Sequence, residues 1–399
     1  MLIGHQWITL LLIIFHTKYF IMTKKFNFFA GLSFSLFIYS NLTHAAAYEI
    51  FDPRALAMGG ASVAAGRSLA PLSNPAQLAL VDERHDIFVD LPIIKQTNNY
   101  SSDFAANLDK YQQVANSQAT GQDNASPTDD LQKSFQALTD QIDTTQLQIT
   151  ASASLANTPI SLALFANGYY TETLTAISHV RNSIQIRQGL ISLKAAAIIE
   201  SGAMFARVFQ QTAGGSNRLS IGISPKLMAI RTYYYAAPAE TINLSSQTKN
   251  ITDTTMLNID IGVIKEFNYI WKTGIVVRNL LAKKIAYDGI AAGSLAIQPQ
   301  ARIGLAYRTA RILVAADLDL TLNSALGYEE KTRFLSTGLE YALTQSIFLR
   351  TGLMKNLLSG GSGSLALGAG IKTNVFAMDV ALSANQQEYT LMAKTGLRF

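Results

Sequence analysis

The histidines of this chain are the residues from which a hydrolytic triad or a metal site would be built. There are five of them: His5, His16, His44, His85 and His179. None stands at a metal-binding spacing, and three lie before or within a segment with the features of a targeting sequence. A triad would have to combine one of the remaining two with a serine and an orienting partner. We therefore predict no enzymatic activity, no metal and no cofactor.

Other motifs that carry chemistry are missing from the sequence as well. No P-loop, G-x-S-x-G elbow or G-x-G-x-x-G motif follows a strand-like segment. The run Ser359-Gly360-Gly361-Ser362-Gly363-Ser364 has the composition of a flexible hairpin loop. The chain contains no cysteine, which excludes disulfides and thiolate metal sites. Its net charge of +5 is spread over single Lys and Arg residues, so we predict no nucleic-acid partner.

The composition indicates what kind of scaffold remains. Only 15% of the 399 residues are charged, against about 25% in soluble domains, while 49% are hydrophobic. Beyond the amino-terminal segment, however, no apolar run reaches the roughly 18 residues that a membrane-spanning helix needs. Apolar content without apolar runs is what alternating strands produce. The 16 Tyr and 19 Phe can supply the aromatic girdles of a membrane barrel.

The end of the chain shows this alternation most clearly. One face of segment 389–399 is apolar and carries Tyr389, Leu391, Ala393, Thr395, Leu397 and Phe399. The other face is polar or small and carries Thr390, Met392, Lys394, Gly396 and Arg398. A soluble sandwich can show the same pattern, but an apolar outer face with a polar lumen is typical of an outer-membrane barrel. A strand that ends the chain on phenylalanine resembles the closing strand of such barrels.

Alternating segments recur to the end of the chain and predict an all-β fold. We expect an antiparallel outer-membrane β-barrel over residues 84–399, with about 14 strands joined by alternating short turns and longer outer loops. Charged residues on the inward parity are expected in the lumen, namely Arg302, Asp317, Asp319 and Lys394. Pro225 interrupts one strand and cannot donate to the ladder, so it predicts a bulge or kink. That irregularity is either harmless or a wall opening through which a ligand leaves sideways.

The amino terminus contains two apolar segments. Met22-Thr23-Lys24-Lys25 forms a basic n-region, the following residues to Leu42 are mostly apolar, and small residues suited to cleavage come next. We expect a cleaved signal peptide over residues 22–45 and export to the outer membrane of a Gram-negative bacterium. Residues 1–21 are apolar too. We interpret them as upstream sequence before a start at Met22, and the alternative is an uncleaved anchor.

Residues 46–83 are rich in Gly and Pro and lack strand periodicity. We expect them to form a plug in the lumen, with a motif made of Arg54, Met58, Gly59, Gly60, Asn74 and Pro75. Adjacent glycines permit positive φ and close approach of backbones, and Asn-Pro favours a helix start or an ordinary tight turn. The Arg54 guanidinium is either solvated or paired with a lumen carboxylate such as Asp317 or Asp319.

Residues 98–145 are polar and contain two patterns with helical spacing. The first face carries Phe104, Leu108, Tyr111 and Val114, and the second carries Leu131, Phe135, Leu138 and Ile142. A flexible connector over 117–128 separates them. We predict a helical hairpin inserted between two strands, on the extracellular side according to the alternation of short and long connections.

Several of these segments resemble a known family when they are taken in order. Residues 54–61 (RALAMGGA) followed by residues 74–78 (NPAQL) resemble the amino-terminal signature of FadL-type hydrophobic-compound transporters and PorV-like barrels. The lead sequence 48–54 (YEIFDPR), residues 91–94 (LPII), the helical insertion and residues 222–227 (GISPKL) are more similar to the TraF-like barrels of plasmid transfer operons. This resemblance implies a barrel of 14 strands behind a plug. The long polar hairpin is a departure from fatty-acid transporters proper.

Two functions remain open at this point. The family resemblance implies a structural component of conjugal transfer or secretion that contacts envelope proteins through residues 98–145. The plug motif and the wider superfamily imply instead a plugged transporter for a hydrophobic ligand. Either protein would have outer-membrane lipid and lipopolysaccharide as its surroundings.

Overall fold

A computed structural model describes most of the chain beyond its amino terminus. The described residues are 44–45, 49–66, 72–80, 87–99, 104–120, 127–139, 142–155, 158–178, 189–211, 217–242, 250–288, 293–323, 331–358 and 363–399. The expected upstream segment over 1–21 and nearly all of the expected signal peptide over 22–45 lie outside them.

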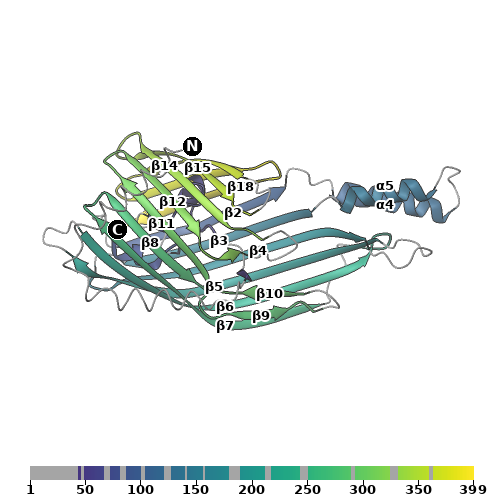
Figure 1. Ribbon diagram of the computed structural model, residues 1–399, viewed down its shortest axis with the longest axis horizontal. Helices are drawn as coiled ribbons and strands as arrows, with labels where there is room; N and C mark the ends of the chain where they lie inside the picture. Colours follow the sequence, from purple (N-terminus) through teal and green to yellow (C-terminus); the bar gives the residue numbers. More distant parts are fainter. Residues whose placement is uncertain are drawn as a thin grey trace, which may run out of the picture. The chain divides into compact units, whose positions relative to one another are not determined.

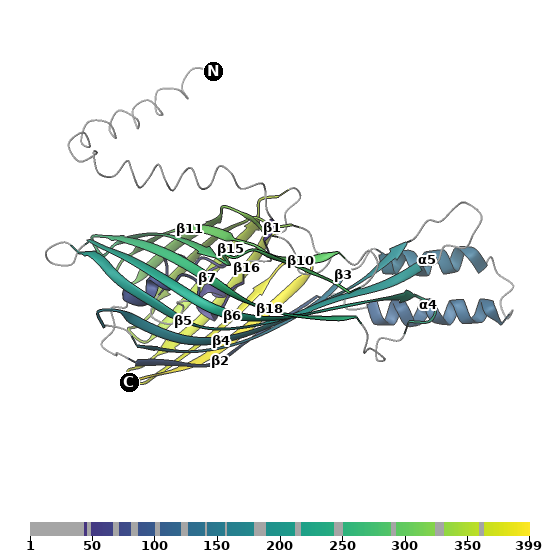
Figure 2. The same ribbon diagram turned by 90° about the horizontal axis from the view of Figure 1, so that it is seen from below.

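Fourteen antiparallel strands close into a barrel (Figures 1 and 2). They are β2 (Ile87–Asn99), β3 (Ile142–Leu155), β4 (Ser161–Ser178), β5 (Gly189–Gln211), β6 (Asn217–Pro238), β7 (Ile251–Phe267), β8 (Trp271–Arg278), β11 (Gln300–Arg308), β12 (Ile312–Asp319), β14 (Phe334–Ala342), β15 (Ile347–Asn356), β16 (Gly363–Lys372), β17 (Phe376–Ala384) and β18 (Glu388–Arg398). The last strand, β18, pairs with the first, β2, and this closes the barrel. The predicted 14-strand antiparallel barrel is confirmed.

Smaller elements lie within or beside this barrel. They are β1 (His44–Ala45), α3 (Pro53–Ala57), the 3₁₀ helix η1 (Pro75–Leu80), α4 (Phe104–Ala119), α5 (Pro127–Thr139), β9 (Lys283–Ala286), β10 (Ser294–Ile297) and β13 (Leu322–Asn323). β1 pairs with β13, and β9 pairs with β10. Within the described part of the chain, no helix has the length and apolarity that crossing a membrane requires.

The two faces of the barrel wall differ as the alternation predicts. In β6, Ile221, Ile223 and Leu227 are exposed on the outer face, while Ser224 and Lys226 are buried toward the lumen. Successive side chains of a strand point to opposite faces, so apolar and polar residues at alternate positions segregate into an apolar exterior and a polar interior.

Pro225 does not cause the bulge that its lack of an N–H predicts. Lys226 pairs with Gly202 and Ile223 pairs with Phe205, so β5 and β6 keep one register across the proline. The register shift between these strands lies instead between Val208 and Gln210. Opposite Pro225, Ala203 and Met204 of β5 are unpaired, but no extra residue is inserted in either strand. Pairing of β6 with β7 continues through the proline.

The barrel wall has two heights. Strands β4–β7, which we call the tall wall, contain 17 to 23 residues each. Strands β11, β12 and β14–β17, which we call the short wall, contain 8 to 10 residues, about the number that crosses a membrane. The tall wall therefore continues well beyond the height of the short wall (Figure 1).

An ion pair on the outer face of the tall wall marks where its apolar band ends. Arg231 of β6 and Asp253 of β7 lie 2.7 Å apart with side chains 62% and 60% exposed. A charged pair on the outer face is costly in hydrocarbon, so the residues beyond it belong above a membrane. β6 continues from there to Pro238, a rise of about 23 Å at roughly 3.3 Å per residue. We call the end of the barrel that carries this extension its upper end.

The predicted helical hairpin exists as α4 and α5, and it covers the outer face of this extension. Phe104, Leu108, Tyr111 and Leu138 pack with Ala176, Ile191, Ala239 and Ile242. Residues 174, 176 and 191 have the outward parity of their strands, which places the helices on the exterior of the wall. The prediction that Ile142 belongs to the second helix is wrong. α5 ends at Thr139, and Ile142 is the first residue of β3, where it is 45% exposed.

Candidate functional site

The segment that precedes the barrel strands lies in the lumen as a plug. It begins near α3, where the Asp52 side chain accepts the Arg54 N–H at 3.2 Å and Pro53 occupies the first turn. Gly59 and Gly60 follow with φ values of 63° and 89°. A Cβ on Gly59 would lie 2.6 Å from the backbone of Leu353, so glycine allows both the left-handed turn and the close approach to β15.

A chain of buried ion pairs fastens α3 to the short wall. Arg54 Nε lies 2.7 Å from Glu340 Oε2, and Glu340 also pairs with Arg350 at 2.8 Å. Arg350 continues the chain to Asp379 at 2.6 Å. We expected Arg54 either to be solvated or to pair with a lumen carboxylate such as Asp317 or Asp319. It does pair with a lumen carboxylate, but with Glu340 of β14 and not with either of the two aspartates named.

The charge on Arg54 is maintained in this buried position. Burial lowers the pKa of Arg54, but the carboxylates of Glu340, Asp52 and Asp379 together more than offset this, so the pKa is raised overall. On the opposite side of α3, Lys394 Nζ pairs with Asp52 Oδ1 at 2.8 Å. A buried charge without a partner is strongly destabilising, so each of these pairs fixes the plug at one position against the wall.

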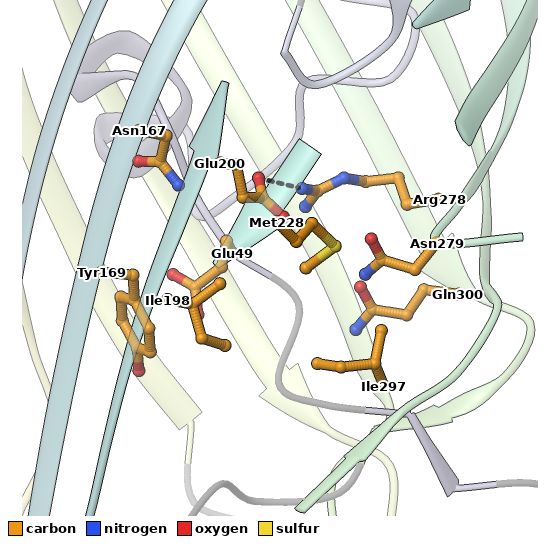
Figure 3. A pocket seen from close by; sticks show the side chains of 10 residues that line it. All are labelled: Glu49, Asn167, Tyr169, Ile198, Glu200, Met228, Arg278, Asn279, Ile297 and Gln300. Carbon is orange, nitrogen blue, oxygen red and sulfur yellow. Dashed lines mark ion pairs between the residues drawn. The ribbon is translucent and has the colours of Figure 1, made fainter. Parts of the chain in front are cut away.

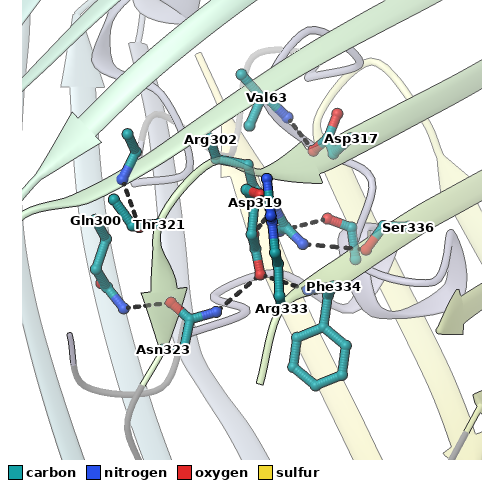
Figure 4. A network of polar contacts seen from close by, with 12 residues as sticks. Val63, Gln300, Arg302, Asp317, Asp319, Thr321, Asn323, Arg333, Phe334 and Ser336 are labelled. Carbon is teal, nitrogen blue, oxygen red and sulfur yellow. Dashed lines mark hydrogen bonds and ion pairs between the residues drawn. The ribbon is translucent and has the colours of Figure 1, made fainter. Parts of the chain in front are cut away.

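The other predicted lumen charges hold the next part of the plug (Figure 4). Asp317 Oδ2 accepts the backbone N–H groups of Ser62 and Val63 at 2.7 and 2.9 Å. Arg302 donates to the Gly60 carbonyl at 3.2 Å and pairs with Asp319 at 2.7 Å. These contacts join two strands of the short wall, β11 and β12, to the plug backbone.

The second half of the plug motif lies at the foot of the tall wall. Asn74 is fully buried, and its Oδ1 accepts the Ala76 N–H at 3.0 Å, which caps η1. Its Nδ2 donates to the Val63 carbonyl at 3.1 Å, so it ties η1 to the preceding turn. Pro75 opens η1, and Ser220 of β6 donates to the Ala76 carbonyl at 2.7 Å. Met58 between the glycines and α3 is buried as well.

A pocket lies in the lumen beside the start of the plug (Figure 3). Its cavity volume is about 30 Å³, the space of about one water molecule. Its lining residues are Glu49, Asn167, Tyr169, Ile198, Glu200, Met228, Arg278, Asn279, Ile297 and Gln300.

One side of this pocket is apolar and is completed by an inward-folded hairpin. The lumen face of the tall wall contributes Tyr169, Ile198 and Met228, which pack against Ile285 of β9 and Ile297 of β10. The sequence suggested only an outer loop between β8 and β11. The sequence does contain a signal for a strand pair with one buried face: apolar residues stand at every second position, Ile285 and Tyr287 in the first strand and Leu295 and Ile297 in the second.

Charged Glu49, Glu200 and Arg278 also line the pocket, and Lys226 and Asp260 lie next to them outside the lining. Lys226 Nζ lies 3.1 Å from Glu200 and 3.0 Å from Asp260. Arg278 lies 3.8 and 3.7 Å from the same two carboxylates, and its guanidinium stands 4.3 Å from the ring of Phe51 in the plug. Among the residues that the structure describes, no group of acidic residues and histidines is arranged to hold a metal ion.

Comparison with known proteins places this architecture. The fold is similar to that of a TodX deltaS2S3 mutant monoaromatic hydrocarbon channel, with a TM-score of 0.51 and 13% identity over 87% of this chain and 98% of that one. The Pseudomonas putida toluene transporter TodX gives a TM-score of 0.48 at 12% identity over 89% and 99% of the two chains. A Pseudomonas aeruginosa FadL homologue gives 0.44 at 9% identity over 89% and 98%. The first of these similarities, together with the closed barrel of 14 strands, shows the fold of an outer-membrane barrel.

A sequence family is identified more directly. No curated protein matches the sequence significantly. Residues 71–319, from the plug to the end of β12, match a family described as "F plasmid transfer operon, TraF, protein". The match covers more than half of the 399 residues, and the chain therefore belongs to this TraF family.

Proposed function

We propose that this protein is a plugged outer-membrane channel that takes up hydrophobic small molecules through the lumen pocket. The observation that carries the proposal is the apolar cluster that borders the pocket on the lumen face of the tall wall, with Tyr169, Ile198 and Met228, packed against the β9–β10 hairpin. The interior of a simple porin is polar, so apolar side chains at this place favour a hydrophobic cargo. The similar structure with a TM-score of 0.51 is a monoaromatic hydrocarbon channel, which supports the same class of cargo.

The plug defines how such a channel would work. The described parts of the plug, residues 49–66 and 72–80, are held by ion pairs and hydrogen bonds to the short wall and by η1 on the tall wall. A molecule bound in the pocket can pass only when part of this segment moves. Two residues at the start of the plug contact the pocket: Glu49 lines it, and the Phe51 ring stacks on the lining residue Arg278. Ligand binding is thereby coupled to the start of the plug.

Uptake measurements test this proposal. Cells that carry the protein should accumulate a hydrophobic aromatic probe faster than cells without it. Ile198→Trp, which fills the pocket from the tall wall, should abolish the difference, and deletion of residues 104–139 should leave it intact. Equal accumulation with the wild-type protein, with Ile198→Trp and with no protein at all would refute transport.

A second function is favoured by the family and by the position of the hairpin. We propose as the alternative an envelope component of conjugal transfer or secretion, in which α4 and α5 contact a partner protein above the membrane. The apolar faces of both helices, which first suggested such contact, are buried on the tall wall. A partner would therefore meet their polar outer surface, which includes exposed Asp109 and Lys110.

Affinity purification in mild detergent separates the two functions. If the alternative is right, envelope proteins co-purify in stoichiometric amount and are lost when residues 104–139 are deleted, while the barrel still inserts. A barrel that purifies alone, with hydrophobic molecules bound, would support transport and count against assembly.

A further inference from the structure

A buried carboxylate with one unpartnered oxygen lies on the barrel wall near the plug. Asp90 of β2 is only 3% exposed. Its Oδ2 accepts the Ser152 hydroxyl at 3.0 Å, but its Oδ1 has no hydrogen-bond partner among the residues that the structure describes. Buried carboxylates are normally paired with a cation or fully hydrogen-bonded, so Asp90 is able to accept one more interaction.

A β-bulge in β2 directs Asp90 into the lumen. Asp90 and Thr97 are both buried, although an odd number of positions separates them and a regular strand would place them on opposite faces. The registers with β3 and with β18 both shift between Asp90 and Ile93, so this stretch of β2 contains one extra residue. It includes Pro92, which cannot donate to the ladder and is tolerated at a bulge.

The lysine that holds the start of the plug is a neighbour of Asp90. Lys394 Nζ pairs with Asp52 of the plug at 2.8 Å. Gly396, the next lumen-facing residue of β18, lies opposite Asp90, so Lys394 and Asp90 are diagonal neighbours on one face. No side chain comes between them, since even a Cβ on Gly396 would lie 3.0 Å from Asp90 Oδ1. The Lys394 ammonium interacts electrostatically with Asp90 as well as with Asp52, and its flexible stem allows it to turn.

The other wall carboxylate that acts on Lys394 already has a cation. Asp379 lies opposite Lys394 on β17, but it pairs with Arg350 at 2.6 Å. Arg350 also lies 2.8 Å from Glu340, so Glu340 keeps a cation on the wall when the plug leaves. Lys394 keeps a partner in that event only if it turns to Asp90.

We propose that Asp90 is the second partner of Lys394, and that this exchange of partners makes α3 a releasable latch. When α3 leaves the wall, Lys394 turns from Asp52 to Asp90 Oδ1, and the Asp52 carboxylate passes into water. Small displacements stay unfavourable, because Asp52 would then be buried without its cation. The inference deepens the proposed transport function and rests on it, because it concerns how the same plug opens.

The Asp52→Asn variant tests the exchange directly, because it removes the plug charge and keeps a side chain that caps α3. A crystal structure of the full chain with this substitution, in detergent, should show Lys394 Nζ about 3 Å from an Asp90 oxygen. Lys394 that stays away from Asp90 in this structure overturns the proposal. This result requires no second substitution, so it decides the matter even if the double variant described next does not fold.

Combination with Asp90→Asn tests the same exchange through stability. Each single substitution leaves Lys394 one carboxylate, whereas the double variant leaves it none that is free. The double variant should therefore lower the temperature of the heat-modifiability transition by more than the sum of the two single shifts. Asp253→Asn is the matched control, because it removes a carboxylate from an exposed pair on the outer face and should be additive with Asp52→Asn. Additivity for Asp90→Asn as well overturns the proposal.

Hydrogen exchange measures the release of α3 itself. The Leu56 N–H donates to the Asp52 carbonyl at 2.9 Å and becomes exchangeable when α3 opens. Asp90→Asn should slow this exchange on the order of tenfold, because release would then leave Lys394 without a partner. Exchange that is unchanged or faster in Asp90→Asn counts against the latch.

The outcomes separate this inference from the transport proposal. Protein-dependent uptake of the aromatic probe, without the expected effects of Asp52→Asn and Asp90→Asn, would leave transport standing and remove the latch. The expected effects together with protein-independent uptake would support the exchange of partners and refute transport. Absence of both overturns both.

Discussion

The tall wall and the short wall enclose the same lumen but contribute different chemistry to it. The lumen face of the short wall is charged, and its Arg302, Asp317 and Glu340 are committed to the plug. The lumen face of the tall wall carries an apolar cluster with Tyr169, Ile198 and Met228 beside a buried ion-pair group of its own, Glu200, Lys226 and Asp260, and it meets the plug mainly through η1 near its foot. One side of the barrel therefore fastens the plug, while the other offers a surface to a ligand.

The difference teaches how a plugged barrel can combine closure with binding. Buried ion pairs fix one geometry, because a partner that moves away leaves an uncompensated charge. Apolar surfaces are less directional and accept ligands of varied shape. A plug held by charges on one side and lying beside an apolar pocket on the other has a defined closed position and a site at which cargo can disturb it.

Glu340→Ala is expected to have the largest effect on this division. It removes the carboxylate shared by Arg54 and Arg350, at a cost of about 3–5 kcal/mol for a broken buried pair. The plug should loosen, seen as faster proteolysis within residues 49–80 and greater leakage of hydrophobic antibiotics. Asp253→Ala on the exposed pair of the tall wall is the control and should change neither. Equal effects of the two would remove the distinction between the walls.

Leu138→Ala tests the outer cover of the tall wall. Leu138 of α5 is fully buried between the hairpin and the tall wall, and its truncation should lower the local free energy of unfolding by about 2–5 kcal/mol. Hydrogen exchange should accelerate in α4 and α5, while the barrel keeps its heat-modifiable gel mobility. Lys110→Ala on the exposed side of α4 should leave exchange unchanged. Loss of the barrel with Leu138→Ala would show that the two parts are not separable.

Gly352→Ala tests how closely the plug approaches the short wall. A Cβ at this position would collide with the backbone of Met58 and Gly59, so overpacking should cost about 1–3 kcal/mol and displace the plug. Gly363→Ala is the control, because its Cβ would meet only the Met354 carbonyl at an ordinary 3.5 Å. Protease sensitivity of the plug is the readout. If both variants resist protease like the wild type, the close approach is not needed.

The smallest expected effect is a pH dependence at the hairpin. Burial, together with the hydrogen bond to Glu240 at 2.8 Å, raises the pKa of Tyr111 above its ordinary value. The stabilisation is therefore fully present below about pH 10, the unfolded value, and is lost as the pH rises further. Hydrogen exchange in α4 should accelerate above that pH. Tyr111→Phe should show no such step, and a step that persists in it would assign the titration elsewhere.

Much of this fold could be predicted from local patterns. Alternation alone identified the strands, because lipid and lumen impose opposite preferences on successive residues such as Asp317 and Leu318. Gly59-Gly60 predicted a tight turn because few other residues adopt positive φ, and both do so here. The two helices followed from spacings of three and four residues.

Contacts between distant segments could not be predicted in the same way. Parity places Glu340, Asp317 and Asp319 all in the lumen, but only the height of α3 in the barrel decides which of them Arg54 meets. The pocket had no local signal either, since Asn279 and Ile198 come together only when β5 and β8 are placed in the barrel. The apolar faces of the two helices were predicted, but their burial against the tall wall was not.

The ion pairs of α3 also constrain the order in which this protein can fold. Arg54 and Asp52 precede every barrel strand, yet their partners Glu340 and Lys394 lie 286 and 342 residues later, on β14 and β18. Contacts of such sequence separation form late, because a long loop must close before they are gained. The ion pairs of the amino-terminal segment with the barrel wall can therefore form only after β14 and β18 have been added to the barrel. Seating of this segment and closure of the barrel by β18 then become parts of one late cooperative step.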